Sequence, residues 1–299
     1  MKEKPLISVV IPIFNGEEYL KDIYHNFINQ TYDCWEVLFV NDLSTDKTLE
    51  IISGYSQADS RFRVINRETK GGTTVKGIEY ALPYCKGDYF FFMSHDDFME
   101  DTFLERCVQR ALETEADTVI PNLVLYWDKE KQIKHGKYPL DNNYESTISP
   151  REAFCLSLEW DLHSNAFRKM DLVRNVGYKA EYYNSCEFYG RKMFLYSNKI
   201  VFCNTNFYYR QSNPNAITKN FHYFQIDILT TDIMLFEIMR EEKYDKMLQR
   251  KRLKAITKSC FEWTKTCLRT EMSNEERKYM KRSLLKAGGK ILKFWLEVW

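Results

Sequence analysis

The feature that most constrains the fold is an apolar run that ends in two adjacent carboxylates, residues 90–97 (FFFMSHDD). Continuous hydrophobic residues are typical of a parallel strand that is covered on both faces. In open α/β sheets, ligands bind at the carboxyl ends of the strands, so Asp96 and Asp97 are expected where chemistry takes place. Such carboxylates suit Mg²⁺ or Mn²⁺, which binds one or two carboxylates together with the oxygens of a bound phosphate. The alternative is that the pair caps a helix that begins near Asp101.

Strand-like and helical segments alternate over the first 127 residues. Apolar and β-branched runs predict strands at 7–12, 35–40, 63–65, 88–93 and 117–127. The segments between them predict helices at 17–30, 47–58, 73–84 and 100–114. This alternation requires a mostly parallel sheet with right-handed crossovers. We therefore predict an α/β fold of the nucleotide-binding type. Residues 129–149 are predicted to form a long loop, residues 166–175 a helix, and the chain beyond Phe221 further helices.

Composition excludes several functional classes. The net charge of +1 gives no basic field for nucleic acid, and the eight scattered cysteines lack the spacing of a zinc site. The amino terminus does not resemble a signal peptide, and no apolar run is long enough to span a bilayer. We expect a cytoplasmic protein that does not bind nucleic acid.

Two polar loops follow predicted strands at the same edge of the sheet. The first is 41–46, which contains Asp42 and Ser44, and the second contains Asp96. A carboxylate at such a position can accept hydrogen bonds from a ribose hydroxyl or a base N–H, although Asp42 could also cap the next helix. The sequence contains neither GxxxxGK[ST] nor GxGxxG, which argues against a P-loop or dinucleotide site. The remaining candidate is a site that binds a nucleoside diphosphate through side chains and a metal ion.

These segments resemble a known family. Residues 7–15 (ISVVIPIFN), 40–48 (VNDLSTDKT) and 92–98 (FMSHDDF) are similar to the three amino-terminal motifs of family 2 glycosyltransferases. Residues 185–188 (SCEF) resemble the acidic motif that supplies the catalytic base of that family. Residues 208–210 (YYR), followed by 216–218 (AIT), resemble the strand and loop that close its active site. The resemblance implies the GT-A fold, a nucleotide-sugar donor, Mg²⁺ or Mn²⁺, and inversion at the anomeric carbon.

The resemblance also implies roles for single residues. Its motifs place the donor on Pro12, Phe14, Asn15, Asp42, Ser44, Asp96 and Arg210. Asp42 would bind the base or ribose, Asp96 would be the metal carboxylate, and Arg210 would steady the diphosphate. Glu187 would be the catalytic base, and Asp97 would support Asp96 or meet the acceptor.

The chain departs from the family pattern at several positions, and in the second loop Asn41 replaces an Asp and Leu43 a usual Gly. Ser94 stands where the first residue of an Asp-x-Asp motif is expected, and Thr74-Val75 stand where many members have Arg-Asn near the diphosphate. Metal affinity should therefore be weaker, or depend more on the donor's own oxygens. The departures leave open a degenerate GT-A domain that binds a nucleotide or a partner without turnover. A nucleotidyltransferase is disfavoured because its Gly-rich basic phosphate loop is missing.

The end of the chain combines basic and aromatic residues. Segment 277–299 carries seven Lys or Arg residues and ends in Trp299, and Gly288-Gly289 is expected to interrupt its helix. A basic segment with interfacial aromatics can lie on an anionic membrane, although a docked or dimer-forming helix has a similar pattern. We predict a GT-A domain over 1–220, with a nucleotide-binding half (1–127) and an acceptor half (128–220), and a helical extension over 221–299.

The resemblance implies an inverting glycosyltransferase of the hexosyl or N-acetylhexosaminyl type. By resemblance, the donor would be a UDP-sugar and the acceptor a hydroxyl of a saccharide or a lipid-linked saccharide. The resemblance also indicates assembly of a bacterial surface polysaccharide.

Overall fold

The computed structural model describes residues 4–298, which divide into two compact units. The first unit comprises the chain up to Lys179 together with Tyr189–Asn213. The second comprises Ala180–Phe188 and the chain from Pro214 onward. The predicted division into a GT-A domain over 1–220 and a helical extension over 221–299 stays a prediction.

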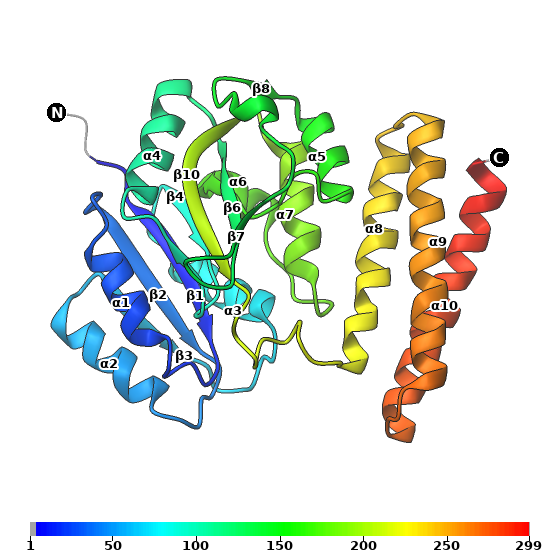
Figure 1. The fold of residues 1–299 in the computed structure, drawn as a ribbon, viewed down its shortest axis with the longest axis horizontal. Coiled ribbons are helices and arrows are strands. Elements are labelled where there is room, and N and C mark those ends of the chain that lie inside the picture. The colour runs from blue at the N-terminus through cyan, green and yellow to red at the C-terminus, as the bar shows by residue number, and fades with distance from the viewer. Residues whose placement is uncertain (1–3, 299) are drawn as a thin grey trace. The chain divides into compact units, whose positions relative to one another are not determined.

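The first unit is built on a ten-stranded sheet, in the order β3-β2-β1-β4-β9-β6-β10-β5, with β7 beside β6 and β8 beside β10 (Figure 1). Strands β1, β2, β3 and β4 are parallel to one another, and β10 is parallel to β6. The short strands β5, β7, β8 and β9 all pair in antiparallel fashion. The bounds are β1 Ile7–Ile13, β2 Trp35–Asn41, β3 Phe62–Asn66, β4 Tyr89–Phe92, β5 Phe98–Met99, β6 Thr118–Tyr126, β7 Gln132–His135, β8 Thr147–Ile148, β9 Phe167–Lys169 and β10 Ile200–Arg210.

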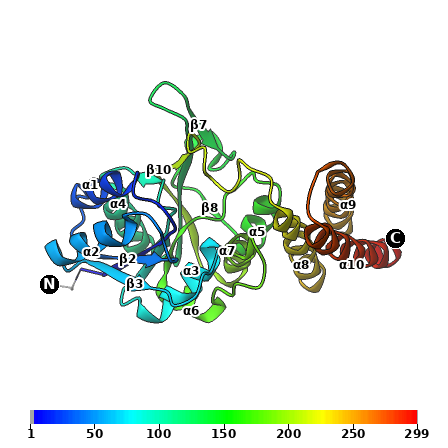
Figure 2. The same cartoon turned by 90° about the horizontal axis from the view of Figure 1, so that it is seen from below.

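Helices cover both faces of this sheet (Figure 2). On one face, Val9 and Ile11 of β1 belong to a buried cluster with side chains of α1 and α4. On the other, Pro12 meets α3 so closely that a Cβ on Gly77 would lie 2.6 Å from the Pro12 Cβ. The parallel strands are therefore buried on both sides, as their apolar sequences predict. The helices are α1 Leu20–Ile28, α2 Thr48–Ala58, α3 Thr74–Ala81, α4 Phe103–Thr114, α5 Pro150–Leu158, α6 Met170–Val176 and α7 Ser185–Tyr196, with short 3₁₀ turns at Leu82–Tyr84 and Leu140–Asn142.

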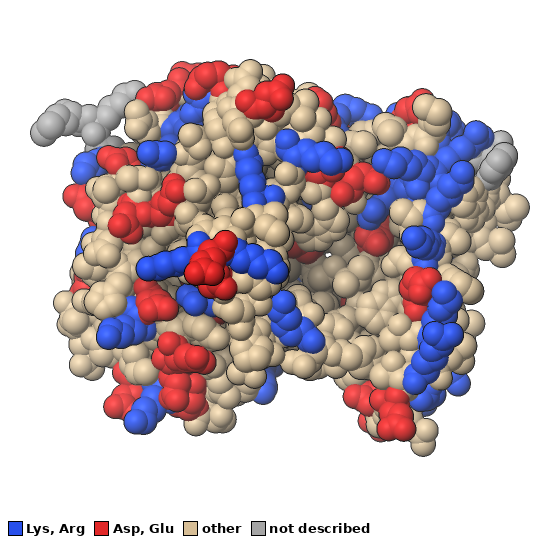
Figure 3. All heavy atoms as spheres, viewed as in Figure 1, with Lys and Arg blue, Asp and Glu red and all other residues tan. Residues whose placement is uncertain are grey.

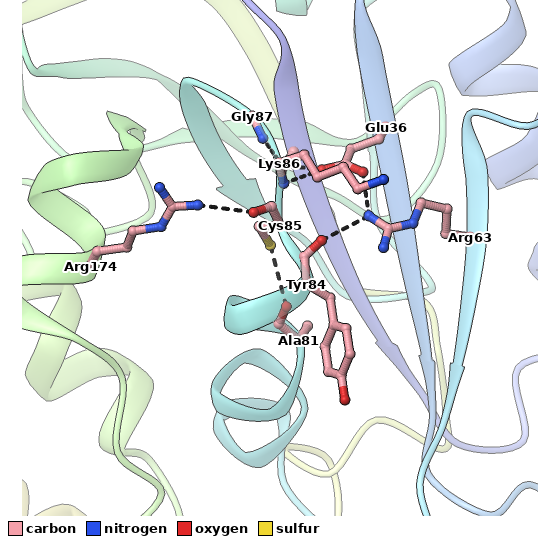
Figure 4. Close-up of polar contacts among 9 residues, drawn as sticks. Glu36, Arg63, Ala81, Tyr84, Cys85, Lys86, Gly87 and Arg174 are labelled. Atoms are coloured by element: carbon pink, nitrogen blue, oxygen red, sulfur yellow. Dashed lines mark hydrogen bonds and ion pairs between the residues drawn. The ribbon is translucent and has the colours of Figure 1, made fainter.

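A polar network ties the strands together where β4 begins, before Tyr89 (Figure 4). The buried Glu36 accepts hydrogen bonds from the Ser8 hydroxyl at 2.7 Å and the Lys86 amide at 2.6 Å, and it pairs with Arg63. The Ser8 hydroxyl also accepts from the Gly87 amide at 2.8 Å. These groups satisfy one another, so the buried carboxylate at this end of the sheet is structural. The polar groups at the opposite end, after Phe92, are the ones to consider for function.

The second unit is a helical bundle of α8 Asp227–Glu241, α9 Lys246–Arg269 and α10 Asn274–Val298, preceded by the 3₁₀ turn Tyr223–Ile226. Its core includes Phe236 and Phe294, whose rings lie 5.1 Å apart. The buried Asp227 accepts a hydrogen bond from the Tyr279 hydroxyl at 2.7 Å, and the Trp295 indole donates to Thr257 at 3.1 Å. Basic side chains line the exposed face of α9, where Lys251, Lys254 and Lys258 recur at helical spacing (Figure 3).

The five strands predicted within the first 127 residues are confirmed, as is the helical end of the chain. Three local predictions are wrong. Segment 129–149 is not one continuous loop, because it contains β7 and β8, which pair with β6 and β10. Segment 166–175 begins as β9 before it becomes α6, and α10 continues through Gly288-Gly289. Tertiary contacts outweigh local propensity in these segments. Strand β9 pairs with β4 and β6, and Ala287 and Ile291 are buried on either side of the glycine pair. No helix within residues 4–298 is long and apolar enough to cross a membrane.

Candidate active site

The predicted carboxylate pair forms a buried turn directly after β4. Asp96 is 7% exposed, and its Oδ2 accepts a hydrogen bond from the Asn213 side-chain amide at 2.6 Å. Asp97 is 4% exposed, and its Oδ1 accepts from the Arg210 backbone amide at 2.9 Å. Helix α4 begins at Phe103 without a side-chain cap. The pair is thus tied to the end of β10 rather than to the next helix, so the capping alternative is wrong.

Burial and the adjacent carboxylate act together on Asp97. Loss of solvation and repulsion from Asp96 raise the pKa of the Asp97 carboxyl well above its usual value, and the charge of Arg210 opposes this shift only in part. The fold therefore stabilises the protonated form of Asp97 relative to the unfolded chain. The two roles predicted for Asp97, supporting Asp96 and meeting the acceptor, both stay predictions.

Arg210 completes this cluster. Its Nε donates to the Asp96 carbonyl oxygen at 2.7 Å, and its guanidinium lies 5.4 Å from the Tyr19 ring and 5.5 Å from the Phe98 ring. The Asp22 carboxylate approaches it at 3.4 Å. This arrangement places a fixed positive charge beside the Asp96 turn, where a diphosphate would need one.

Asp42 holds a second loop at the same edge of the sheet. Its Oδ1 accepts a hydrogen bond from the Gly71 amide at 2.5 Å and its Oδ2 from the Gly72 amide at 2.7 Å, and Arg67 lies 3.3 Å away. Gly72 has φ of 73°, a conformation that favours glycine. Sequence reasoning missed Arg67 and this clamp, for which the Gly71-Gly72 pair is the available signal. A carboxylate has about four acceptor sites, so Asp42 can still accept from a base or ribose.

The other residues predicted to bind the sugar donor lie in the loops that follow β1 and β2. Phe14 is 39% exposed, and the Lys70 ammonium lies 3.9 Å from its ring centroid. Asn15, at φ of 49°, donates its backbone amide to the Ser44 hydroxyl at 3.0 Å and accepts from the Thr45 amide at 2.8 Å. Asn15 and Ser44 therefore join the β1 and β2 loops to each other. The structure brings Phe14, Asn15, Asp42 and Ser44 together, with Pro12 packed on Gly77 below them.

His95 connects the two clusters. Its ring packs so tightly on Gly16 that a Cβ there would lie 2.7 Å from Cδ2, and the Tyr19 ring is 6.0 Å away. Burial lowers the pKa of His95, which favours the neutral imidazole. His95 thus packs on the Gly16 loop, while the Asp96 carboxylate turns to Asn213.

The side chains present do not form a metal site by themselves. No group of three or more His, Cys, Asp or Glu within the described part of the chain could hold a metal ion. Asp96 has a carboxylate at the strand end, with Ser94 in place of a second one. This donor set fits only the mode in which Mg²⁺ or Mn²⁺ takes most of its ligands from phosphates and water.

Glu187 lies in the first turn of α7, within the Ala180–Phe188 segment of the second unit. Its backbone amide donates to the Asn184 carbonyl at 3.0 Å, and its side chain is half-buried. Nearby Ser185 closes the turn by donating its hydroxyl to the Tyr182 carbonyl at 2.8 Å. The helix start is therefore well ordered by local contacts, and the catalytic role of Glu187 stays a prediction.

The glycosyl transferase family 2 model matches residues 8–213, more than half of the chain and both clusters of the site. The chain belongs to glycosyl transferase family 2. It is 28% identical over 228 residues to glycosyltransferase GlyG of Streptococcus pneumoniae, covering 72% of this chain and 74% of that protein. It is also 34% identical over 110 residues to TuaG of Bacillus subtilis, a putative teichuronic acid biosynthesis glycosyltransferase, covering 37% and 43% of the two chains.

Solved structures confirm the GT-A fold of this glycosyltransferase. Residues 1–349 of S. aureus TarS, solved with UDP-GlcNAc, superpose with a TM-score of 0.69 at 16% identity, covering 96% of this chain and 80% of that one. The Pyrobaculum calidifontis mannosyltransferase PcManGT, solved with GDP-Man and Mn²⁺, gives a TM-score of 0.57 at 13% identity, covering 97% and 88%. The predicted family, fold class and helical carboxyl-terminal region are therefore confirmed.

Proposed function

We propose that this family 2 glycosyltransferase transfers a sugar from a UDP-sugar to an acceptor hydroxyl, with inversion at the anomeric carbon. The observation that carries the proposal is the Asp96–Asp97 turn, held by Arg210 and Asn213 at the carboxyl end of β4. A carboxylate and a guanidinium fixed side by side can bind the metal ion and the phosphate oxygens, respectively, of a metal-bound diphosphate. The UDP-GlcNAc bound by TarS and the biosynthetic name of TuaG support a UDP-sugar donor and a surface polysaccharide product.

Each cluster would act on a different part of the donor. The Asp42 loop and the exposed ring of Phe14 would hold the base and ribose. Asp96 would hold Mg²⁺ or Mn²⁺, which when bound neutralises charge on the departing diphosphate. Arg210 would orient the same phosphates. Glu187 would take the proton of the acceptor hydroxyl, because an inverting transfer needs a base on the face opposite the leaving group.

Calorimetry with UDP and Mn²⁺ tests the site directly. Asp96→Asn should remove most of the metal-dependent part of the binding, because a neutral amide is a poor ligand for a hard cation. Asp128→Asn is the matched control, since Asp128 is an exposed carboxylate that accepts hydrogen bonds from the Glu130 and Lys131 amides. Ser94→Asp should bind the metal equally or more tightly. Unchanged metal-dependent affinity in Asp96→Asn would refute the assignment.

Release of UDP from a panel of UDP-sugars separates catalysis from binding alone. We expect the wild type to release UDP slowly without an acceptor and faster with one. Ser94 and Thr74 favour the second candidate, a degenerate GT-A domain that binds without turnover. Tight UDP binding with no release from any UDP-sugar would establish that candidate and refute the transferase.

A further inference from the structure

An exposed tryptophan at the end of α5 stands in an unusual backbone conformation. The Asp161 amide donates to the Leu156 carbonyl at 3.2 Å and the Trp160 amide to the Ser157 carbonyl at 3.3 Å. These two bonds are those of a Schellman motif, in which glycine is the usual residue at the left-handed position. Here Trp160 occupies that position, with φ of 61°, and remains 49% exposed. A bulky residue is disfavoured in this conformation, and burial of its ring does not offset the cost.

The ring of Trp160 is nevertheless held firmly. The guanidinium of Arg191 lies 4.4 Å from the ring centroid, and Arg191 is itself 3% exposed and donates its Nε to the Ser157 carbonyl at 3.0 Å. The His135 ring meets the indole edge-on at 5.8 Å. A rigid aromatic surface costs little conformational entropy when a ligand covers it, so this ring is preorganised for binding.

A second loop is clamped against the tryptophan turn. The Lys137 amide donates to the Asp161 carbonyl at 2.8 Å, and the Lys137 ammonium pairs with the Asp161 carboxylate at 2.8 Å. Gly136, at φ of 86°, permits this approach, because a Cβ there would lie 2.9 Å from the Asp161 carbonyl oxygen. The turn that carries the exposed ring thus also holds an ion pair, whose ammonium and carboxylate can bind hydroxyl groups.

The strand pairing places the segment that carries this platform along the edge of β6 that faces β4. Strand β10 occupies one edge of β6 over its whole length, so β9 and then β7 share the other edge, which faces β4. Strand β9 pairs with β4 only at Tyr89 and Phe90. Residues before β9 continue along β6, where His163 contacts the Pro121 carbonyl at 2.8 Å. Trp160 therefore lies on the side of β6 that faces the carboxyl end of β4, which leads into the Asp96 turn.

We propose that Trp160 is a stacking platform for a pyranose ring of the acceptor, with Lys137 and Asp161 binding its hydroxyls. This inference rests on the proposed function and names the residues that would hold the saccharide acceptor; an open-chain polyol would not bind to this surface. The face of an indole carries negative charge density, and the C–H groups on one face of a pyranose are weakly positive and apolar. A polyol has no such continuous face. Arg191 is a positioning residue that fixes the indole from behind.

Saturation-transfer NMR with simple glycosides tests the platform without knowledge of the natural acceptor. The probes are methyl β-D-glucopyranoside, methyl β-D-galactopyranoside and methyl β-D-N-acetylglucosaminide, with ribitol as the open-chain probe. We expect the wild type to transfer saturation to the ring C–H groups of at least one pyranoside and not to ribitol. In Trp160→Gly the affinity should fall about tenfold or more, and Trp160→Phe should retain part of it.

Two comparisons make the test decisive. Glycine is the usual residue at this turn, so Trp160→Gly should melt at or above the temperature of the wild type, which excludes misfolding as the cause of lost binding. Tyr196→Ala is the matched control, since Tyr196 is also an exposed aromatic, 57% exposed, with a Lys192 cation 5.7 Å from its ring. Its glycoside binding should equal that of the wild type.

Three results would overturn the platform: no pyranoside signal from the wild type, an unchanged signal in Trp160→Gly, or ribitol binding that depends on Trp160. Failure of the proposed function is a separate outcome. A chain that binds glycosides through Trp160 but releases no UDP from any UDP-sugar would refute the transferase and keep the platform. A chain that releases UDP normally but shows no pyranoside binding would keep the transferase and refute the platform.

Discussion

Replacing Asp42 by alanine removes the carboxylate that holds the loop Arg67–Gly72 to the sheet. That carboxylate is 13% exposed and accepts from two backbone amides at 2.5 and 2.7 Å, with Arg67 at 3.3 Å and 11% exposed. A hydrogen bond to a charged group contributes about 1.5–3 kcal/mol, so the two amides together set an upper range of about 3–6 kcal/mol. Water can reach the Gly72 amide and the loop can open locally, which lowers the cost. We expect Asp42→Ala to reduce the free energy of unfolding by about 3 kcal/mol.

The asparagine variant should fall between the alanine variant and the wild type. Its amide oxygen can accept a hydrogen bond from one of the two glycine N–H groups, whereas its NH₂ group must face the other N–H donor. We therefore expect the free energy of unfolding to fall by about 1–2 kcal/mol. Urea denaturation measures both losses, and hydrogen exchange of the Gly71 and Gly72 amides reports the loop itself. Asp128→Asn is the control, because an exposed carboxylate on two backbone amides should cost no more than about 0.5 kcal/mol.

A third variant separates loop position from direct contact with the nucleotide. A Cβ on Gly71 would lie 2.6 Å from an Arg67 guanidinium nitrogen and 3.0 Å from the Asp42 carboxylate, so Gly71→Ala displaces the loop while keeping the charge. If Asp42 acts on UDP through the loop, Gly71→Ala should weaken UDP binding about as much as Asp42→Asn does. Asp42 would not hold this loop if Asp42→Ala changed the free energy of unfolding by less than about 0.5 kcal/mol and left hydrogen exchange at Gly71 and Gly72 unchanged.

Three further predictions concern other parts of the chain. The raised pKa of Asp97 means that the fold stabilises its neutral form, so its contribution to wild-type stability should decline as pH rises from about 3.8. Asp97→Asn should lack this decline, so its stability relative to the wild type should increase with pH. Parallel pH profiles of the urea midpoints of the two proteins would contradict this. Glu187→Gln should reduce turnover by about 10²–10⁴ with UDP affinity retained, whereas the exposed neighbour Glu181→Gln should not; full activity of the first variant would place the base elsewhere. Leu285 and Leu292 are 77% and 64% exposed on the basic helix α10, so their joint replacement by Asp should weaken sedimentation with phosphatidylglycerol vesicles, as should high salt. A wild type that does not sediment with such vesicles would favour a purely structural helix.

Local pattern was enough to predict the parallel half of the sheet and the edge at which its polar loops gather. Buried parallel strands are written as apolar runs, and the residues that follow them must lie at one edge, so Asp42 and Asp96 could be placed without coordinates. The same sequence does not show which partners hold them. Asn213 reaches Asp96 across 117 positions, and Gly71 reaches Asp42 across 29, because these contacts arise from strand order and not from neighbouring residues.

Tertiary structure also decided elements whose local sequence indicates another conformation. The three residues of β9 form a strand only because β4 and β6 offer backbone groups on either side, and α10 passes through Gly288-Gly289 because side chains before and after the pair are buried in the bundle. Trp160 is the clearest case, since nothing in its own segment indicates a left-handed residue or an arginine 31 positions later behind its ring. Short-range propensity is worth less than about 1 kcal/mol per residue, so pairing and packing between distant segments outweigh it wherever the two disagree.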